Sequence, residues 1–428
     1  MYCRAVILRD PVHGLISFTG AREGLLIRLM DTREVQRLRR IRALGLASYA
    51  FPGGEHSRFA HAVGSAYVMR RYLERVWDLS HELPVADRID ADTELIALAA
   101  ALLHDLGHGP YSHTFETVLP GAQRHELWTS QLILDPDTQV HRVLRELDPQ
   151  APAEVERLVH GKHAIAHLAR AVSGTFDVDR CDYLLRDSHM TGVRYGTLDL
   201  DWLLQSLRLH RPQGAEAASL AVDGEKGLTA VEGFFLARLH MYRQVYLHKA
   251  VRAAEVMVQA SFQRLLETGP PPGTPKALAK VLRGESLTTL DYLALDDTTL
   301  ETAWAAYAEG EDPVLRRLAL GIRERRLLKT HPVDPRVDRA AAEAVLREAL
   351  GPDLPASMAV LDRVEVQAYA EDEALAVLEG DGRLTNLLDA SPLMLGLSRE
   401  TFVVSRAVFP AEIRERVQAG LDALRPAG

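Results

Sequence analysis

Residues 100–115, AALLHDLGHGPYSHTF, end one helical pattern and begin another. Apolar residues recur with helical spacing over residues 95–103, and the pattern stops at the following His-Asp pair. A Gly-Pro pair at 109–110 then predicts a turn. Four ionisable side chains therefore gather near one helix end: His104, Asp105, His108 and His113. Histidine and carboxylate groups at one point favour a metal site or a proton-transfer site.

The His104-Asp105 pair alone decides little. With 17 His and 59 acidic residues among 428, about two His-acid pairs are expected by chance, and the chain has three. The other two are His81-Glu82 and His125-Glu126. His104-Asp105 differs from them because further histidines follow within a few positions, where a turn can direct them toward one point.

The composition predicts a globular, mainly helical protein, since 47% of residues are hydrophobic, 25% are charged and few are aromatic. A formal net charge of −9 argues against a dedicated nucleic-acid surface, which would be basic. The longest uncharged apolar run is too short to cross a membrane, and the first residues lack the apolar segment of a signal peptide. We therefore expect a cytoplasmic protein with no membrane partner. Two cysteines in this length do not suggest a disulfide framework.

Spacing along the chain predicts the other elements. Helices are expected at 59–79, at 177–190, as several short segments within 124–172, and as one long helix at 228–266, with hairpins at 5–18 and 207–222. A helical stripe over 35–44 carries a basic run expected to be exposed: Arg37, Arg39, Arg40 and Arg42.

A segment rich in Pro and Gly at 269–276 is the clearest boundary in the sequence. It predicts a core domain at 1–268 and a smaller C-terminal α+β unit at 277–428, used for packing, oligomerisation or regulation. A strand is expected within this unit at 364–369.

Three other segments carry side chains that can complete the central site. His61 begins the helix at 59–79, where a lone histidine is more often a cap or packing residue. Residues spaced every fourth position share one helix face, as do Asp179, Tyr183 and Asp187, and as do Arg238, Tyr242 and Tyr246. Exposed helix charges and an ordinary amphipathic stripe would give the same two patterns.

Read together, six segments resemble the HD-domain phosphohydrolases. They are DPVHGLI, DTREVQRLRRIRALG, FPGGEHSRFAH, LLHDLGHGPYSHTFE, DVDRCDYLLRD and RLHMYRQVYLHK, in the order found in that family. The closer resemblance is to the dNTP triphosphohydrolases, which include the sterile-alpha-motif/HD-domain enzymes and bacterial dGTPase-like proteins. The resemblance implies a mainly α fold, an HD-domain helical core with small β-hairpins.

The resemblance also implies a metal site. The separated H…HD…D set of the family falls on His61, His104, Asp105 and Asp179. Imidazole and carboxylate ligands suit one divalent ion, and Fe, Mn, Mg, Zn and Ni all remain open.

The implied reaction hydrolyses a dNTP to a deoxynucleoside and triphosphate. The residues implied for proton transfer beside the α-phosphate are His108, His113, Glu116 and His125, with His113 as the general acid. Glu116 replaces the aspartate common in the family. The residues implied for the triphosphate are Arg58, Arg180, Arg238 and Lys249. Those implied for the deoxyribose and base are Tyr183, Asp187 and Tyr246.

A second resemblance concerns regulation. Asp31, Gln36 and Arg39 match positions that read an activating guanine nucleotide at a subunit interface in some relatives, which implies a homo-oligomer, a dimer or tetramer. Two positions depart from the family pattern: Val6 replaces a lysine, and Ala43-Leu44 replaces Gln-Leu near the nucleotide.

Two alternatives stay open at this stage. The same metal chemistry serves a nucleotidase, a phosphodiesterase or an alarmone hydrolase, and the HD scaffold alone also allows a non-catalytic nucleotide sensor. Release of intact triphosphate would distinguish a dNTP triphosphohydrolase from these alternatives.

Overall fold

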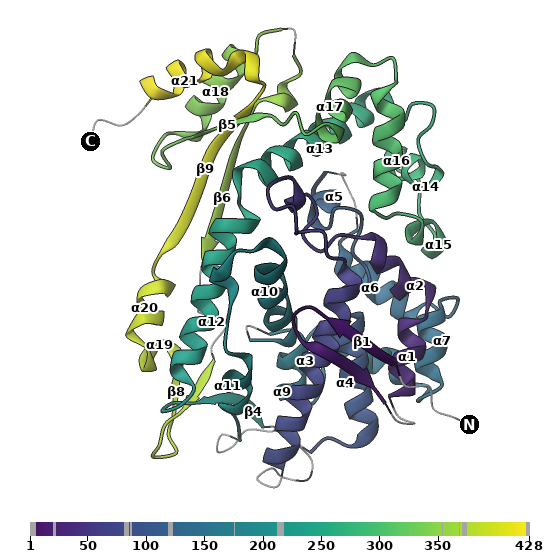
Figure 1. Cartoon of the computed structure of the whole chain (residues 1–428), viewed down its shortest axis with the longest axis vertical. Helices are drawn as coiled ribbons and strands as arrows, with labels where there is room; N and C mark the ends of the chain where they lie inside the picture. Colours follow the sequence, from purple (N-terminus) through teal and green to yellow (C-terminus); the bar gives the residue numbers. More distant parts are fainter. Residues whose placement is uncertain are drawn as a thin grey trace.

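The computed structural model describes residues 6–19, 23–80, 85, 88–118, 123–174, 176–211, 218–352, 354–367, 369 and 375–424. Helices form the body of the molecule, and the strands form three small sheets (Figure 1). This architecture confirms the predicted fold class, a helical core with small β elements. None of the described helices combines the length and the apolar character needed to cross a membrane.

The N-terminal half supplies the hairpin and the core helices. It contains β1 (Val6–Asp10), β2 (Gly14–Phe18), α1 (Gly24–Met30), α2 (Arg33–Arg37), η1 (Leu38–Arg40), η2 (Ala47–Tyr49), α3 (Arg58–Leu79), α4 (Ala91–Leu103), α5 (His113–Val118), α6 (His125–Leu134), α7 (Gln139–Arg145), α8 (Ala151–Val159), α9 (Ala166–Val172), α10 (Val178–Thr191), η5 (Arg194–Gly196) and α11 (Leu200–Gln205).

The rest of the chain adds the remaining helices and two further sheets. It contains β3 (Leu207–His210), β4 (Ser219–Asp223), α12 (Leu228–Met241), η6 (Tyr242–Tyr246), α13 (Lys249–Thr268), α14 (Lys276–Leu282), α15 (Thr289–Leu293), α16 (Asp297–Ala308), α17 (Pro313–Arg323), β5 (Lys329–Pro332), α18 (Arg339–Leu350), η7 (Ala356–Met358), β6 (Val360–Gln367), β7 (Ala376–Leu378), β8 (Leu384–Asn386), α19 (Leu387–Ala390), α20 (Pro392–Ser398), β9 (Thr401–Phe409), η9 (Ala411–Ile413) and α21 (Arg414–Ala423).

Helices α3, α4 and α10 position the site. Ser57 caps α3 by accepting a hydrogen bond from the backbone N–H of Ala60, which fixes where the helix begins. The apolar residues of α4 from Leu95 to Leu103 are all buried, so this helix lies inside the core. Because α3 packs against both α4 and α10, the ends of three helices that are distant in sequence meet at one place.

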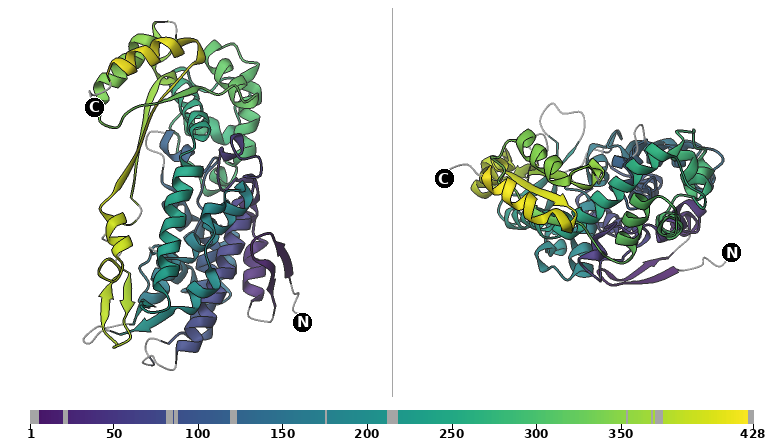
Figure 2. Two further views of the ribbon diagram at one scale, coloured as in Figure 1. Left: turned by 60° about the vertical axis from the view of Figure 1, so that its left-hand side comes forward. Right: turned by 90° about the horizontal axis from the view of Figure 1, so that it is seen from above.

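The sheets lie at the edges of this helical body. Strands β1 and β2 pair antiparallel, β3-β4-β7-β8 form a mixed sheet, and β5-β9-β6 form an antiparallel one. In Figure 2 the β1–β2 hairpin and the long β6–β9 ribbon lie on opposite sides of the helices. The strand pairs of both predicted hairpins are present, while residue 5 and residues 212–217 lie outside the described residues. The strand expected at 364–369 is found as β6, which runs from Val360 to Gln367, and residue 368 lies outside the described residues.

The single long helix predicted at 228–266 is wrong. The chain forms α12, continues as the π-helical turn η6, leaves helical geometry at Leu247 and His248, and starts again as α13. His248 is extended, and its side chain accepts from the N–H of Ala250, so it caps the new helix. The apolar pattern persists through the break, which is why periodicity did not reveal it.

The basic run is not exposed throughout, because Arg37 is 1% exposed. Its guanidinium donates to the carbonyl oxygens of Leu295 and Leu106. These backbone acceptors compensate for the burial of the Arg37 charge. The helical pattern predicted to reach residue 44 ends earlier, with η1 at Arg40.

The division of the chain into two domains by a linker at 269–276 remains a prediction. Helices beyond it contribute to the same continuous core as α3 and α4, through residues such as Leu278, Leu300 and Trp304. The Tyr292 ring stacks on Trp128 at 3.9 Å between centroids and 8° between planes.

Replacing Tyr292 with alanine is therefore expected to destabilise the part of the molecule that carries the site. Loss of this buried ring should lower the free energy of unfolding by about 3 kcal/mol, measured by urea denaturation followed by circular dichroism. Leu290→Ala on the same helix is the matched control, since Leu290 is 60% exposed. Equal midpoints for the two variants would contradict a shared core.

Candidate metal centre and catalytic cleft

The four side chains of the predicted metal set meet at the ends of α3, α4 and α10. His61 lies in the first turn of α3, His104 follows the last residue of α4, and Asp179 lies in the first turn of α10. Nε2 of His61 is 2.9 Å from Asp179 Oδ1, and Nε2 of His104 is 3.3 Å from the same oxygen. The Asp105 oxygens lie 3.7 Å from His61 Nε2 and 3.5 Å from His104 Nε2.

The orientation of both imidazoles fits a divalent cation. Asp182 accepts a hydrogen bond from His61 Nδ1 at 2.8 Å, and the Ala101 carbonyl accepts one from His104 Nδ1 at 2.9 Å. Both Nε2 atoms therefore face the Asp105 and Asp179 carboxylates. His104 Nε2 is buried and makes no hydrogen bond to any described residue. Two inward nitrogens and two carboxylates form a donor set that suits a transition metal or Mg²⁺.

The neighbouring charges set the protonation of this centre. Burial lowers the pKa of His61, but hydrogen bonds with Asp179 and Asp182 outweigh it and raise this pKa to about 10. Burial disfavours an ionised Asp105, yet Arg58 and the adjacent histidines hold its pKa well below the usual range. The carboxylates are thus anionic, and a metal ion would displace the proton from His61.

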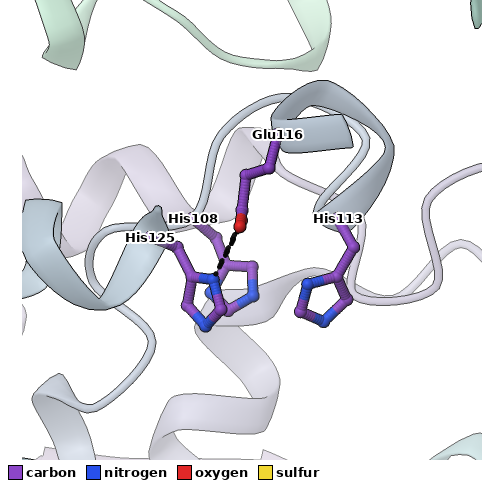
Figure 3. Close-up of side chains that lie close together, drawn as sticks. All are labelled: His108, His113, Glu116 and His125. Atoms are coloured by element: carbon purple, nitrogen blue, oxygen red, sulfur yellow. Dashed lines mark hydrogen bonds and ion pairs between the residues drawn. The ribbon is translucent and has the colours of Figure 1, made fainter. Parts of the chain in front are cut away.

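His108, His113, Glu116 and His125 form a second cluster (Figure 3). It adjoins the metal set where His108 Nδ1 lies 3.2 Å from Asp105 Oδ1. The His108 and His125 rings are 4.0 Å apart, and His113 lies 5.1 and 5.2 Å from them. The Glu116 carboxylate accepts from His125 Nδ1 at 3.1 Å. The structure therefore brings together all four residues predicted for proton transfer.

The backbone around this cluster explains the close approach. A Cβ at Gly107 would lie 2.1 Å from the carbonyl oxygen of His125, so only glycine lets the turn after α4 meet the start of α6. Tyr111 and Ser112 both have positive φ, at 52° and 55°, immediately before His113. This uncommon geometry turns the chain so that His113 begins α5 beside the other rings.

The first of two cavities beside the metal set encloses about 710 Å³, and both arginines and carboxylates line it. Arg170, Arg180 and Arg238 line it together with His113 and His125. Its carboxylates are Asp105 and Asp179 of the metal set, Glu126, and Asp177, which pairs with Arg180. Desolvation and the charge of Arg58 lower the pKa of His113.

The second cavity encloses about 500 Å³, and its lining combines tyrosines and apolar residues with charged ones. Tyr183, Asp187 and Tyr246 line it, as do Ala43 and Leu44. Asp105, Asp179, His113 and His125 line both cavities, so the metal set lies where the two meet.

Asp187 is held in place inside the second cavity. It accepts from the Tyr246 hydroxyl at 2.8 Å and from His56 Nε2 at 2.9 Å. Burial raises the pKa of Tyr183 and of Tyr246 well above the usual range, so both remain neutral phenols. His56 lies inside one of the motif segments, but nothing in its spacing pointed to this role.

Of the residues predicted to bind the triphosphate, the arginines line the two cavities and the lysine does not. Arg58 is buried beside the metal set, where it pairs with Asp105 and donates to Ser112 Oγ at 3.0 Å. Arg180 pairs with Asp177 at 2.7 Å and also contacts the Gly174 carbonyl. Lys249 lies apart from these residues: it is exposed at the start of α13 and lines neither cavity.

The residues predicted for regulation lie together near α1 and α2. Gln36 donates to the Met30 carbonyl at 2.7 Å and accepts from Arg39 Nε at 2.8 Å. The Arg39 guanidinium lies 3.6 Å from the centroid of the Phe59 ring. Asp31 is exposed at the end of α1.

Comparison with protein families identifies the class of protein that this fold and site define. Residues 58–185 match the HD domain, and residues 198–348 match the HD associated region. The chain belongs to the HD-domain phosphohydrolase family, which confirms the membership predicted from the sequence motifs. HD domains bind divalent metals, and the His61–His104–Asp105 cluster is placed to hold one.

The individual relatives include proteins with and without a known activity. The chain is 32% identical over 422 residues to the uncharacterized protein YwfO of Bacillus subtilis, covering 95% of this chain and 92% of that one. It is 28% identical over 287 residues to the deoxynucleoside triphosphate triphosphohydrolase SAMHD1 of Bos taurus, covering 60% of this chain and 47% of SAMHD1.

Among solved structures, the chain resembles a phosphohydrolase, BT4208, from Bacteroides thetaiotaomicron. The TM-score is 0.78 at 26% identity, covering 95% of this chain and all of that one.

Proposed function

We propose that the protein is a metal-dependent dNTP triphosphohydrolase that converts a deoxynucleoside triphosphate to a deoxynucleoside and triphosphate. The observation that carries this proposal is the position of the metal set between a cavity lined by three arginines and a cavity lined by several tyrosines. A nucleotide with its α-phosphate at the metal would extend its remaining phosphates into the first cavity and its sugar and base into the second. The similarity to SAMHD1 supports the same substrate class.

The arginines of the first cavity suit a polyphosphate. Arg180 and Arg238 can offer planar paired N–H donors to phosphate oxygens, and Arg170 adds a third positive charge. We assign Arg58 to the α-phosphate, since its guanidinium already lies against Asp105 of the metal set. Lys249 would need another arrangement of α13 to reach this cavity.

The second cavity suits a deoxyribose. Asp187, fixed by Tyr246 and His56, can accept from a sugar hydroxyl, and the Tyr183 ring can pack against the sugar face. With the Tyr183 ring against the sugar, the 2′ hydroxyl of a ribose would meet an aromatic face, and a polar group that loses its hydrogen bonds to water is costly. The site should therefore prefer deoxyribonucleotides.

The reaction requires that a water oxygen attack the α-phosphorus and that the bond from phosphorus to the 5′ oxygen break. A divalent ion, when bound by His61, His104, Asp105 and Asp179, supplies charge neutralisation and activation of water. His113 would donate the proton that the departing 5′ oxygen takes up. The negative charge of a bound triphosphate would favour protonated His113, whose pKa desolvation and the charge of Arg58 otherwise lower. Glu116 and His125 are hydrogen-bonded to each other beside His113, and they would take up the proton that the attacking water loses and pass it to His113.

The direct test is to incubate the metal-loaded protein with each dNTP and each NTP and to identify the products by ion-exchange chromatography. Triphosphate from dNTPs supports the proposal. Monophosphate, diphosphate or pyrophosphate products would instead favour another HD phosphohydrolase, and the absence of turnover in every mixture would favour a nucleotide sensor.

We further propose that an activating nucleotide binds at Asp31, Gln36 and Arg39 and favours a dimer or tetramer. The proximity of Gln36 to Arg39 supports a common surface, on which Arg39 is exposed. Assays with pairs of nucleotides test this proposal. We expect turnover of one dNTP to require a second nucleotide, and we expect light scattering to show a larger mass of the protein when that nucleotide is present.

Replacing Tyr246 with alanine is expected to weaken substrate binding more than it slows the chemical step. The change removes a ring from the sugar cavity and a donor from Asp187. KM for the best dNTP should rise about tenfold, roughly 1.4 kcal/mol, with a smaller change in kcat. Tyr195→Ala is the control, because the Tyr195 side chain is 60% exposed. A fall in kcat alone would contradict the assigned role.

A further inference from the structure

A fully buried carboxylate lies directly behind the metal set. Asp182 is 0% exposed and accepts four hydrogen bonds, from His61 Nδ1 at 2.8 Å, His13 Nε2 at 2.7 Å, and Arg186 Nε and Nη2 at 2.9 Å each. Each oxygen accepts two of them. Asp182 does not face either cavity, so it has no direct access to substrate.

The same network reaches the N-terminal hairpin. Arg186 donates through Nη1 to Asp10 Oδ2 at 2.8 Å. The other oxygen of Asp10 accepts from the backbone N–H groups of Val12 and His13 at 2.9 Å, which fixes the turn between β1 and β2. Asp10 and His13 therefore connect this turn to a carboxylate that contacts a metal-set histidine.

The contact between α3 and α10 allows for this carboxylate. A Cβ on Gly64 would lie 1.9 Å from Asp182 Oδ1 and 2.4 Å from Arg186 Nη2. Only a glycine one turn beyond His61 leaves room for Asp182 at hydrogen-bonding distance from the His61 ring. Gly64, Asp182 and Arg186 therefore determine both how α3 packs against α10 and how the His61 ring is oriented.

We infer that Asp182 is a positioning residue of the metal centre, and that the β1–β2 turn is part of that centre through His13 and Asp10. Asp182 accepts a hydrogen bond from the Nδ1–H of His61, which keeps the proton on Nδ1 and leaves the lone pair of Nε2 directed at the metal. Arg186 and His13 hold the carboxylate in this orientation. A carboxylate behind a ligating histidine fixes its tautomer and ring angle and increases its basicity.

This inference rests on the proposed metal site, but not on the proposed substrate. Its test is therefore a binding measurement with Mn²⁺, whose free ion is counted by electron paramagnetic resonance. A protein that hydrolysed no dNTP would still give the same dissociation constants.

Asp182→Asn is expected to raise the dissociation constant for Mn²⁺ between about 10-fold and 100-fold. Asp362→Asn is the matched control, because Asp362 is also buried and accepts two hydrogen bonds from an arginine, Arg252, away from the metal set. If the two variants lose similar stability in EDTA and only Asp182→Asn loses affinity, the inference is supported. Wild-type affinity in Asp182→Asn would overturn it.

Variants of His13 test the proposed link between the β1–β2 turn and Asp182. They also provide a test if Asp182→Asn does not fold. His13→Gln keeps an N–H donor for Asp182, whereas His13→Leu removes it. His13→Leu should bind Mn²⁺ about tenfold more weakly, and His13→Gln should remain within about threefold of wild type. Equal dissociation constants for the two variants would show that the side chain only fills space and would overturn the link to the hairpin.

Discussion

Replacing Asp179 with alanine is expected to abolish both metal retention and turnover. Asp179 Oδ1 is the carboxylate oxygen nearest to Nε2 of both metal-set histidines, so its loss removes a ligand and a negative charge from the centre. Turnover should fall by more than about a thousandfold, equivalent to roughly 4 kcal/mol of transition-state stabilisation. Metal content after gel filtration, measured by inductively coupled plasma mass spectrometry, should be near zero.

Two comparisons make this result specific. Asp201→Ala changes an aspartate whose side chain is 82% exposed and should retain metal and activity. Treating the wild type with a chelator should remove activity that added metal restores, whereas added metal should not restore Asp179→Ala. Full turnover by Asp179→Ala would remove the proposed mechanism.

Replacing His113 with glutamine is expected to slow turnover while leaving the metal bound. His113 lies between the two cavities but is not one of the four residues of the metal set. Removing a general acid typically lowers the rate about 100-fold to 10,000-fold. Triphosphate release and metal content should be measured on the same preparation.

A substrate with a better leaving group gives the decisive control for His113. An aryl triphosphate ester releases a phenolate that needs no proton, so the variant should approach the wild-type rate on it. An equal loss on both substrates would contradict a role in protonating the 5′ oxygen. His141→Gln, in α7 and hydrogen-bonded to the Ile133 carbonyl, is the histidine control.

The sequence could predict which helix ends carry the metal-set residues, because each of these ends has a strong local sequence signal. Ser57 before an amphipathic run indicates where α3 begins, and the abrupt end of the apolar pattern at His104 indicates where α4 ends. Local signals of this kind place side chains on helix ends. The family resemblance then supplied which ends meet, since one sequence contains no information on tertiary distance by itself.

The supporting residues could not be found in this way. Asp182 and Arg186, four positions apart, have the spacing of an exposed helical ion pair, yet both are buried. His13 and Asp10 are more than 160 positions from the residues that they contact. Arg37 was expected on the surface for the same reason: charge predicts exposure unless acceptors come from elsewhere in the chain.

The π-helical turn at Tyr242–Tyr246 makes chain length as important as residue identity in this region. An α-helix advances by about 100° per residue, so deletion of one residue within the turn would rotate the side chains that follow it, as far as Tyr246, by more than a quarter circle. Tyr246 would no longer face Asp187. Substitutions between Arg238 and Tyr246 can be absorbed one side chain at a time, whereas a single insertion or deletion there would move several lining side chains at once.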